Sequence, residues 1–191
     1  MNETPTPRSQ AKADRREALL AAAASLFAER GFTRVSLEEL GAAAGVSGPA
    51  VYRHFDGKQD VLAAMLVDAS TNLRSGAQRV IEHAATPRAA LESLVKFHVN
   101  FALGNADVIR VQDRDLDSLA ASDQHEVRTL QRSYVELWVG VLSQINPDAA
   151  TAELRTRAHA AFGLINSTPH SGRAGATRAV LERMALAALN A

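Results

Sequence analysis

The 191-residue chain contains 21 Lys and Arg residues and 21 Asp and Glu residues, so its formal net charge is zero. This balance supplies no general attraction to nucleic acids or membrane surfaces, and a DNA-binding face would require basic side chains to be sorted in space. The sequence has no cysteine, which excludes disulfides, thiolate metal sites and thiol redox sensing. We expect a cytoplasmic protein without a membrane segment, because no apolar run approaches the roughly 18 residues that a spanning helix needs.

Alanine-rich runs at 21–24 and 42–44 favour helices over strands, and the hydrophobic periodicity of the chain is helical. Residues 1–10 lack this periodicity and predict a disordered arm. A first helix follows and ends at Gly31. Its apolar side chains recur at helical spacing, at Leu19, Ala22, Ala23, Leu26 and Phe27. We therefore predict an all-α fold of about nine helices.

Two short helices joined by a tight turn are expected next. Ser36 and Glu39 have the spacing of a capping box, which predicts that a second helix begins at Ser36 and stops at Gly45. Ser47 is the next residue able to cap a helix, and Pro49 suits the first turn of a third. This arrangement predicts a helix-turn-helix, although the spacing alone is equally typical of an ordinary helical hairpin.

The third helix should bury Val51 and Phe55 and leave its outer face available for contact. A long helix follows, with an apolar stripe at Leu62, Met65, Leu66, Ala69, Leu73, Ala77, Val80 and Ile81. Pro and Gly punctuation then predicts helices at about 87–103, 106–120, 123–145, 148–166 and 173–190. We expect a DNA-binding domain over residues 1–60 and a larger domain over residues 61–191. The charged residues at 112–117 are interpreted as a solvated face.

The order GF, SxxxL, AAGVS, VYRHF and K between Gly31 and Lys58 resembles the DNA-binding region of TetR/AcrR-family transcriptional regulators. The resemblance covers about residues 14–66. It implies that Tyr52, His54 and Lys58 contact DNA phosphates, as does Ser36 at the start of the second helix. The full set of expected DNA-binding residues is Thr33, Arg34, Ser36, Ser47, Gly48, Pro49, Ala50, Tyr52, Arg53, His54 and Lys58.

Two departures from the family's pattern affect base reading. Gly48 stands where many relatives have Lys, and Pro49 where they have Gly, so a basic side chain is missing from the start of the recognition helix. Specificity would then come from apolar contacts of Pro49 or Ala50 with thymine, from the neighbouring polar side chains, and from DNA shape. Basic residues before and within the first helix are expected to add backbone or minor-groove contacts, namely Arg8, Lys12, Arg15 and Arg16.

The resemblance also implies a homodimer whose last two helices pair with those of a second copy. Two apolar stripes could form this interface, although either could equally be core of the single chain. The expected interface residues are Leu154, Ala158, Ala161, Ile165, Val180, Leu181, Met184 and Ala188. A two-fold partner would also place two recognition helices one DNA turn apart.

The remaining helices should surround an effector pocket, as the resemblance implies. His98 and Gln112 are polar positions on apolar stripes, and a ligand is one partner for such groups; satisfaction by protein or water is the alternative. Aromatic residues nearby could form the walls or belong to ordinary core. The candidate ligand-binding residues are His98, Phe101, Gln112, Tyr134, Trp138 and Phe162.

The resemblance implies a one-component regulator, by family habit a repressor, that binds a palindromic operator and is released by a small hydrophobic or amphipathic effector. Residues 113–138 and the stretch FGLINSTP at 162–169 are loosely similar to regulators of lipid and acyl-CoA metabolism. We expect no cofactor, no metal and no enzyme activity, because no metalloprotease motif, nucleophile elbow or phosphate loop is present. The alternative function is a helical protein-interaction module that has lost sequence-specific DNA binding.

Overall fold

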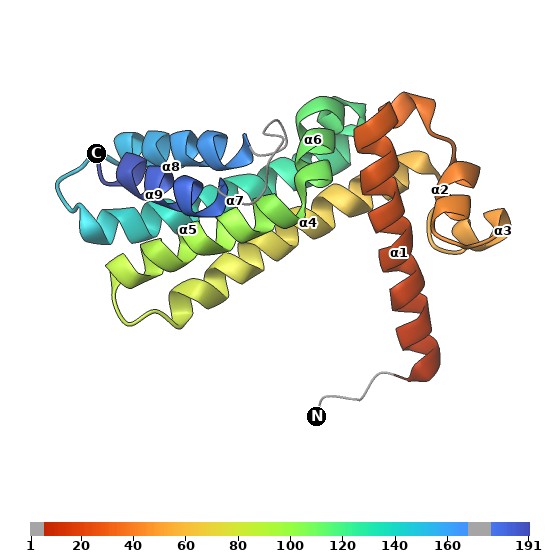
Figure 1. Ribbon diagram of the computed structural model, residues 1–191, viewed down its shortest axis with the longest axis horizontal. Coiled ribbons are helices and arrows are strands. Elements are labelled where there is room, and N and C mark those ends of the chain that lie inside the picture. Colours follow the sequence, from red (N-terminus) through yellow and green to blue (C-terminus); the bar gives the residue numbers. More distant parts are fainter. Residues whose placement is uncertain (1–5, 168–176) are drawn as a thin grey trace.

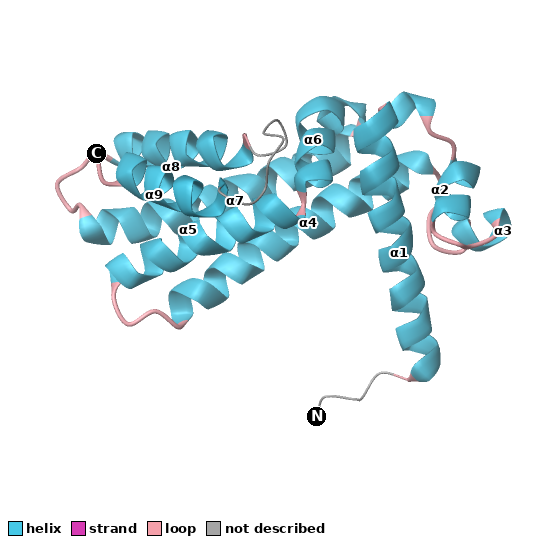
Figure 2. Cartoon of the chain, viewed as in Figure 1, coloured by secondary structure: helices cyan, strands magenta, loops and turns pink. Residues whose placement is uncertain are grey.

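The computed structural model describes residues 6–167 and 177–191, and these fold into nine α-helices and two short 3₁₀ turns (Figures 1 and 2). The N-terminal helices are α1 (Pro7–Arg30), α2 (Leu37–Ala43) and α3 (Gly48–Val51), with the turn η1 (Phe32–Arg34) after α1. The rest are α4 (Lys58–Glu82), α5 (Pro87–Gly104), α6 (Ala106–Asp115), α7 (Ala121–Ile145), α8 (Thr151–Asn166) and α9 (Thr177–Leu189), with η2 (Leu116–Ser118) after α6. The described ranges contain no strand, so the all-α prediction is confirmed.

The first helix begins earlier than the sequence pattern indicates. Thr6 caps α1, with its hydroxyl oxygen accepting from the amide of Ser9 at 3.2 Å, and Pro7 fits the first helical position. Residues 7–10 are therefore helical, and the expected disordered arm is wrong there; residues 1–5 lie outside the described residues. The N-terminal half of α1 projects away from the other helices (Figure 1), which explains why it lacks an apolar face.

Three other boundaries shift by a few residues. The helix expected at 106–120 ends at Asp115 and continues as η2, and α8 starts at Thr151 rather than at 148. The helix expected from 123 begins at Ala121. The expected start of the last helix at 173 lies outside the described residues. Within residues 6–167 and 177–191, no helix is both long and apolar enough to cross a bilayer.

Two hydrophobic cores share α4. The first core holds buried side chains of α1, α2, α3 and the first part of α4, together with Val111, Leu119 and Val127 from the region of α6 and α7. The second core joins the rest of α4 to α5, α7, α8 and α9. A change in the second core can therefore be transmitted to the N-terminal helices through α4 and α6, which contribute side chains to both cores.

Gly76 lets α4 and α5 approach closely. A Cβ at this position would lie 2.2 Å from Cζ of Phe97, so any side chain forces the phenyl ring to move. We expect Gly76→Ala to lower the free energy of unfolding in urea by about 1–2 kcal/mol, because overpacking outweighs the gain in helix propensity. Gly140→Ala in α7 is the control, since nothing lies within 4 Å of its Cβ, and it should stabilise the protein. Equal effects of the two substitutions would contradict the close packing.

Candidate DNA-binding surface and effector cavity

The capping box at the start of α2 is present as predicted. Ser36 Oγ accepts from the Glu39 amide at 3.2 Å, and a Glu39 carboxylate oxygen accepts from the Ser36 amide at 2.8 Å. Hydrogen bonding of the Glu39 carboxylate to the backbone of Ser36, and then to the Ser36 side chain, holds the pKa of this carboxyl below its usual value. Arg30 of α1 pairs with the same carboxylate at 3.1 Å. The start of α2 is thus fixed both locally and against α1.

A tight turn at Gly45, whose φ is +68°, carries the chain from α2 into α3. The turn closes with a hydrogen bond from the Val46 amide to the Gly41 carbonyl at 2.9 Å. The Ser47 carbonyl accepts from the amides of Ala50 and Val51, but the Ser47 hydroxyl makes no capping hydrogen bond, so the predicted side-chain cap is absent. The helix-turn-helix geometry is present, and the Ser47 hydroxyl stays exposed beside the start of α3.

The third helix is shorter than predicted and ends at Val51, so Phe55 lies after it; the outer side of α3 and of the following turn is open, and the inner side is buried. Val51 is fully buried and Phe55 is 3% exposed, as predicted, whereas the Tyr52 side chain is 56% exposed. Among the expected DNA-binding residues whose exposure is described, Ala50, His54 and Lys58 are half-buried. The exposed ones are Thr33, Arg34, Ser36, Ser47, Pro49, Tyr52 and Arg53. The solvent exposure of Gly48 is not described. Most of the expected DNA-binding residues are therefore accessible to a partner.

Basic side chains of α1 gather beside the end of α3. Burial, and then the positive charges of Lys12, Arg15 and Arg16, hold the pKa of His54 below its usual value. Arg16 also lies 5.8 Å from the centroid of the Phe55 ring and pairs with Asp68 of α4 at 2.5 Å. Lys12, Arg15 and Arg16 of α1 thus lie close enough to His54 to act on its charge, in a chain without net charge. This is the spatial sorting of charge that a DNA-binding face requires.

Lys58 lies at the junction between η1 and α4. Its ammonium donates to the Thr33 carbonyl at 3.2 Å and lies 4.6 Å from the centroid of the Phe32 ring. The side chain is half-buried, so the charge is held at one place on the surface. A fixed cation at a helix N-terminus is well placed to meet a phosphate.

A cavity of about 220 Å³ lies among α4, α5, α6, α7 and α8. Five of the six candidate ligand-binding residues line it, namely His98, Phe101, Gln112, Tyr134 and Phe162. Trp138 does not line it; this residue is fully buried, and its ring packs edge-on against Phe162 with centroids 5.0 Å apart. Sequence reasoning missed Ser70, Gln131, His159 and Asn166 in the wall. Asn166 follows Phe162 by four residues on α8, and this spacing was the available signal.

A hydrogen-bonded relay runs along the cavity wall. His98 Nδ1 lies 2.9 Å from the Tyr134 hydroxyl and Nε2 lies 3.1 Å from Asn166 Oδ1. Because the amide oxygen can only accept, Nε2 carries the proton, and Nδ1 accepts from the Tyr134 hydroxyl. Burial lowers the pKa of His98 to about 4 and raises the pKa of Tyr134 above its usual value. The relay is therefore electrically neutral near pH 7.

Three other rings pack around His98. The Phe162 ring stacks on His98 at 4.8 Å and on Tyr134 at 5.4 Å between centroids. The Trp138 indole packs edge-on against His98. Its buried Nε1 has no well-aligned hydrogen-bond acceptor among the described residues. The indole nevertheless opposes part of the rise in the Tyr134 pKa that burial causes. This packing fixes the orientation of the relay.

The neutral state of His98 predicts a pH dependence of stability. The unfolded chain takes up a proton near pH 6.5, while the folded protein does so near pH 4, so stability falls as pH drops between these values. We expect acidification to cost the wild type about 3 kcal/mol more than His98→Gln, measured by urea unfolding at several pH values. The control is His125→Gln on the exposed face of α7. Parallel curves for wild type and His98→Gln would show that His98 is not held neutral.

Two family models match most of the chain. Residues 19–65 match the model described as bacterial regulatory proteins, tetR family, and residues 84–170 match the tetracyclin repressor-like C-terminal domain. The chain belongs to the TetR family. The predicted resemblance is confirmed, and membership identifies a helix-turn-helix transcriptional regulator rather than an enzyme.

Individual relatives agree with this assignment. The transcriptional repressor KstR2 of Rhodococcus jostii is 28% identical over 143 residues, which are 74% of this chain and 70% of KstR2. A TetR-family regulator from Bordetella parapertussis has a TM-score of 0.82 and 26% identity, covering 92% of this chain and 94% of its own. Bacillus subtilis FadR, solved with stearoyl-CoA, has a TM-score of 0.73, 15% identity and coverages of 91% and 95%; it shows the fold alone.

The structure corrects half of the expected dimer interface. Leu154, Ala158, Ala161 and Ile165 have no exposed surface and pack in the second core, so a second copy cannot contact them. An apolar stripe on α8 was open to both interpretations, and the packing of α8 on α7 and α9 decides for core. On α9, Leu181 is buried and Ala188 is half-buried, whereas Val180 and Met184 are 40% and 52% exposed. A TetR-type interface would have to use this exposed face.

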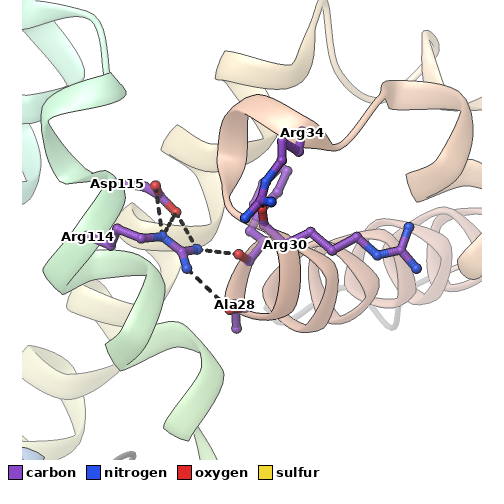
Figure 3. A network of polar contacts seen from close by, with 6 residues as sticks. Ala28, Arg30, Arg34, Arg114 and Asp115 are labelled. Atoms are coloured by element: carbon purple, nitrogen blue, oxygen red, sulfur yellow. Dashed lines mark hydrogen bonds and ion pairs between the residues drawn. The ribbon is translucent and has the colours of Figure 1, made fainter.

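Arg114 at the end of α6 binds the last turn of α1 (Figure 3). Its guanidinium donates to the main-chain carbonyls of Phe27 and Ala28, and it pairs with Asp115 at 2.9 Å. The last carbonyls of a helix carry partial negative charge, so a cation is well placed there. Interpreting 112–117 as a solvated face is thus wrong for Asp115, which is 8% exposed, whereas Arg114 is exposed and also contacts α1.

Proposed function

We propose that this protein is a repressor that binds a palindromic operator as a homodimer in the cytoplasm and is released by a small hydrophobic or amphipathic effector. The observation that supports this most directly is the open face of α3 beside the basic side chains of α1, in a chain that also holds a cavity. KstR2 is named a repressor, which favours repression. Bacillus subtilis FadR was solved with stearoyl-CoA, so acyl-CoA and lipid-like compounds are included among the effectors to test.

We assign DNA binding to residues 1–60 and effector binding and dimerisation to residues 61–191. In this assignment the side chains around α3 contact the operator, and the expected residues that line the cavity bind the effector. The exposed face of α9, with Val180 and Met184, supports pairing with a second copy. Dimerisation would give two recognition helices with the symmetry of a palindrome.

Coupling between the two sites is proposed to run through α4 and α6. Gln112 lines the cavity, and Arg114, two residues later on α6, donates hydrogen bonds to the last turn of α1. An effector that shifts α6 would therefore shift α1, while α4 tilts and changes the separation of the two α3 helices. Effector and operator would select different conformations of the dimer.

Selection of binding sites from a random DNA pool tests the proposal against the alternative of a protein-interaction module. We expect enrichment of a palindrome by the wild type and loss of enrichment in Tyr52→Ala/Arg53→Ala, whose side chains are exposed at the C-terminal end of α3 and in the turn after it. If no sequence is enriched even at low salt, the interaction module is favoured. Analytical ultracentrifugation of the operator complex would count the bound subunits.

The basic side chains of α1 should make the operator affinity salt-dependent. We expect Lys12→Ala/Arg15→Ala to weaken binding roughly tenfold and to lower the slope of log affinity against log salt by about two, because each phosphate contact releases a counterion. Fluorescence anisotropy with labelled operator measures both. The control is Arg88→Ala/Lys96→Ala, which removes two exposed cations from α5. An unchanged slope in the α1 variant would show that α1 does not contact DNA.

A further inference from the structure

The described wall of the cavity is polar but carries no Lys, Arg, Asp or Glu. Its hydrogen-bonding side chains come from five helices and are Ser70, His98, Gln112, Gln131, Tyr134 and Asn166. The other titratable side chain of the described wall, His159, is exposed to solvent at the edge. A charged group placed in the interior of this cavity would meet no counter-ion among the described lining residues, and an unpaired buried charge is strongly disfavoured.

The relay leaves specific hydrogen-bonding capacity for a ligand. Tyr134 gives its proton to His98, which leaves the lone pairs of its oxygen, and Asn166 uses its oxygen, which leaves two amide hydrogens. The carboxamides of Gln112 and Gln131 each offer a donor and an acceptor. A ligand with a hydroxyl, carbonyl or amide group can satisfy these groups without carrying charge.

A groove of about 700 Å³ between α1, α4 and α6 adjoins the cavity, because Ala69, Phe101 and Val108 line both. Its charged lining residues are Arg16, Glu17, Asp68 and Asp107, and Arg16 is already paired with Asp68. Arg110 pairs with Asp107 at 3.2 Å, so the two cations beside the groove are each held by a lining carboxylate, and a phosphate would have to compete with those carboxylates for them. This side of the cavity therefore offers no binding site for the phosphates of a coenzyme A moiety.

We infer that the effector of this protein is a compact, uncharged molecule with an apolar body and a hydroxyl, carbonyl or amide group, and is neither a free carboxylate nor a coenzyme A thioester. This rests on the proposed function of the cavity as the effector site. The volume of about 220 Å³ suits a molecule smaller than a typical drug-sized ligand. The apolar body would lie against Phe101, Ile109 and Phe162, with its polar group on the relay.

Matched probes test whether the cavity prefers uncharged ligands to charged ones. A fragment set is used in which the same phenyl or hexyl body carries an amide, a hydroxyl or a carboxylate, together with hexanoyl-CoA and phenylacetyl-CoA. Trp138, the single tryptophan, packs against the rings of the wall, so its fluorescence reports occupancy. We expect neutral members to bind at least about tenfold more tightly than their carboxylates. Equal affinities, tighter binding of carboxylates or thioesters, or no binding of any neutral member would overturn the inference.

Two variants localise the binding. Tyr134→Phe removes only the hydroxyl and should weaken the amide and alcohol probes roughly tenfold. Gln112→Lys places a cation in the wall and should reverse the preference in favour of the carboxylates. The control is Gln144→Lys on the exposed face of α7, which should keep the wild-type order. An unchanged preference in Gln112→Lys would mean that the probes bind elsewhere and would overturn the assignment to this cavity.

Operator release separates the two proposals. Release by a carboxylate or a thioester, but by no neutral probe, would leave the regulator function intact and refute the uncharged effector. Neutral probes that bind in the cavity of a protein with no operator affinity would support the chemistry of the cavity and refute the regulator function.

Discussion

Gly41→Val is expected to reduce operator affinity by at least about a hundredfold, toward the non-specific level of binding. A Cβ at Gly41 would lie 2.8 Å from Cγ2 of Val51 and 3.2 Å from the Val46 carbonyl oxygen. A rotamer change of Val51 could move the methyl group, but the Val46 oxygen belongs to the backbone of the turn and cannot move in this way. Valine would push α3 away from α2 and misplace the recognition face. Fluorescence anisotropy with the selected operator measures the loss.

The same variant should retain effector binding, because the cavity is formed by α4 to α8. Gly140→Val in α7 is the matched control, since its Cβ meets no atom within 4 Å and operator affinity should be unchanged. Gly41→Val/Val51→Ala removes the nearest methyl group and should recover part of the affinity. Wild-type affinity in Gly41→Val would contradict the close crossing of α2 and α3.

The N-terminal elements could be predicted from the sequence because their signals are local. The capping box of Ser36 and Glu39 spans four residues, and the burial of Val51 and Phe55 follows from their i, i+4 spacing, although α3 itself ends at Val51. The start of α1 was missed because its exposed first turns have no apolar face, so only the cap at Thr6 indicates the helix. Hydrophobic periodicity detects helices that pack and misses those that project.

The cavity was predictable as a set of residues and not as a geometry. Polar and aromatic positions on apolar stripes identified five lining residues, and the structure brings them together. The pairing of His98 with Asn166 spans 68 residues of sequence, and no local pattern encodes it. The apolar stripe at Leu154 could be recognised from the sequence, but its packing partner could not. An apolar face has the same spacing whether it packs in the chain's own core or against a second copy.

Arg114→Met should uncouple effector binding from operator release. The substitution removes the hydrogen bonds from α6 to the carbonyls of Phe27 and Ala28 while keeping a long side chain. The cavity residues are untouched, so we expect effector affinity to be retained. Coupling between sites typically changes affinity by about 5–150-fold, and in this variant the change in operator affinity on adding effector should fall to about twofold or less. Anisotropy titrations of operator with and without effector give this ratio.

The pairing of Arg114 with Asp115 requires a second variant, because Asp115 is buried and would be left without its cation. Arg114→Met/Asp115→Asn removes both charges, so it should recover stability and leave the coupling lost. Arg132→Met, exposed on α7, is the control and should keep wild-type coupling. If the double variant still releases the operator normally, α6 does not transmit the signal through α1, and α4, which both cores share, must carry the coupling alone.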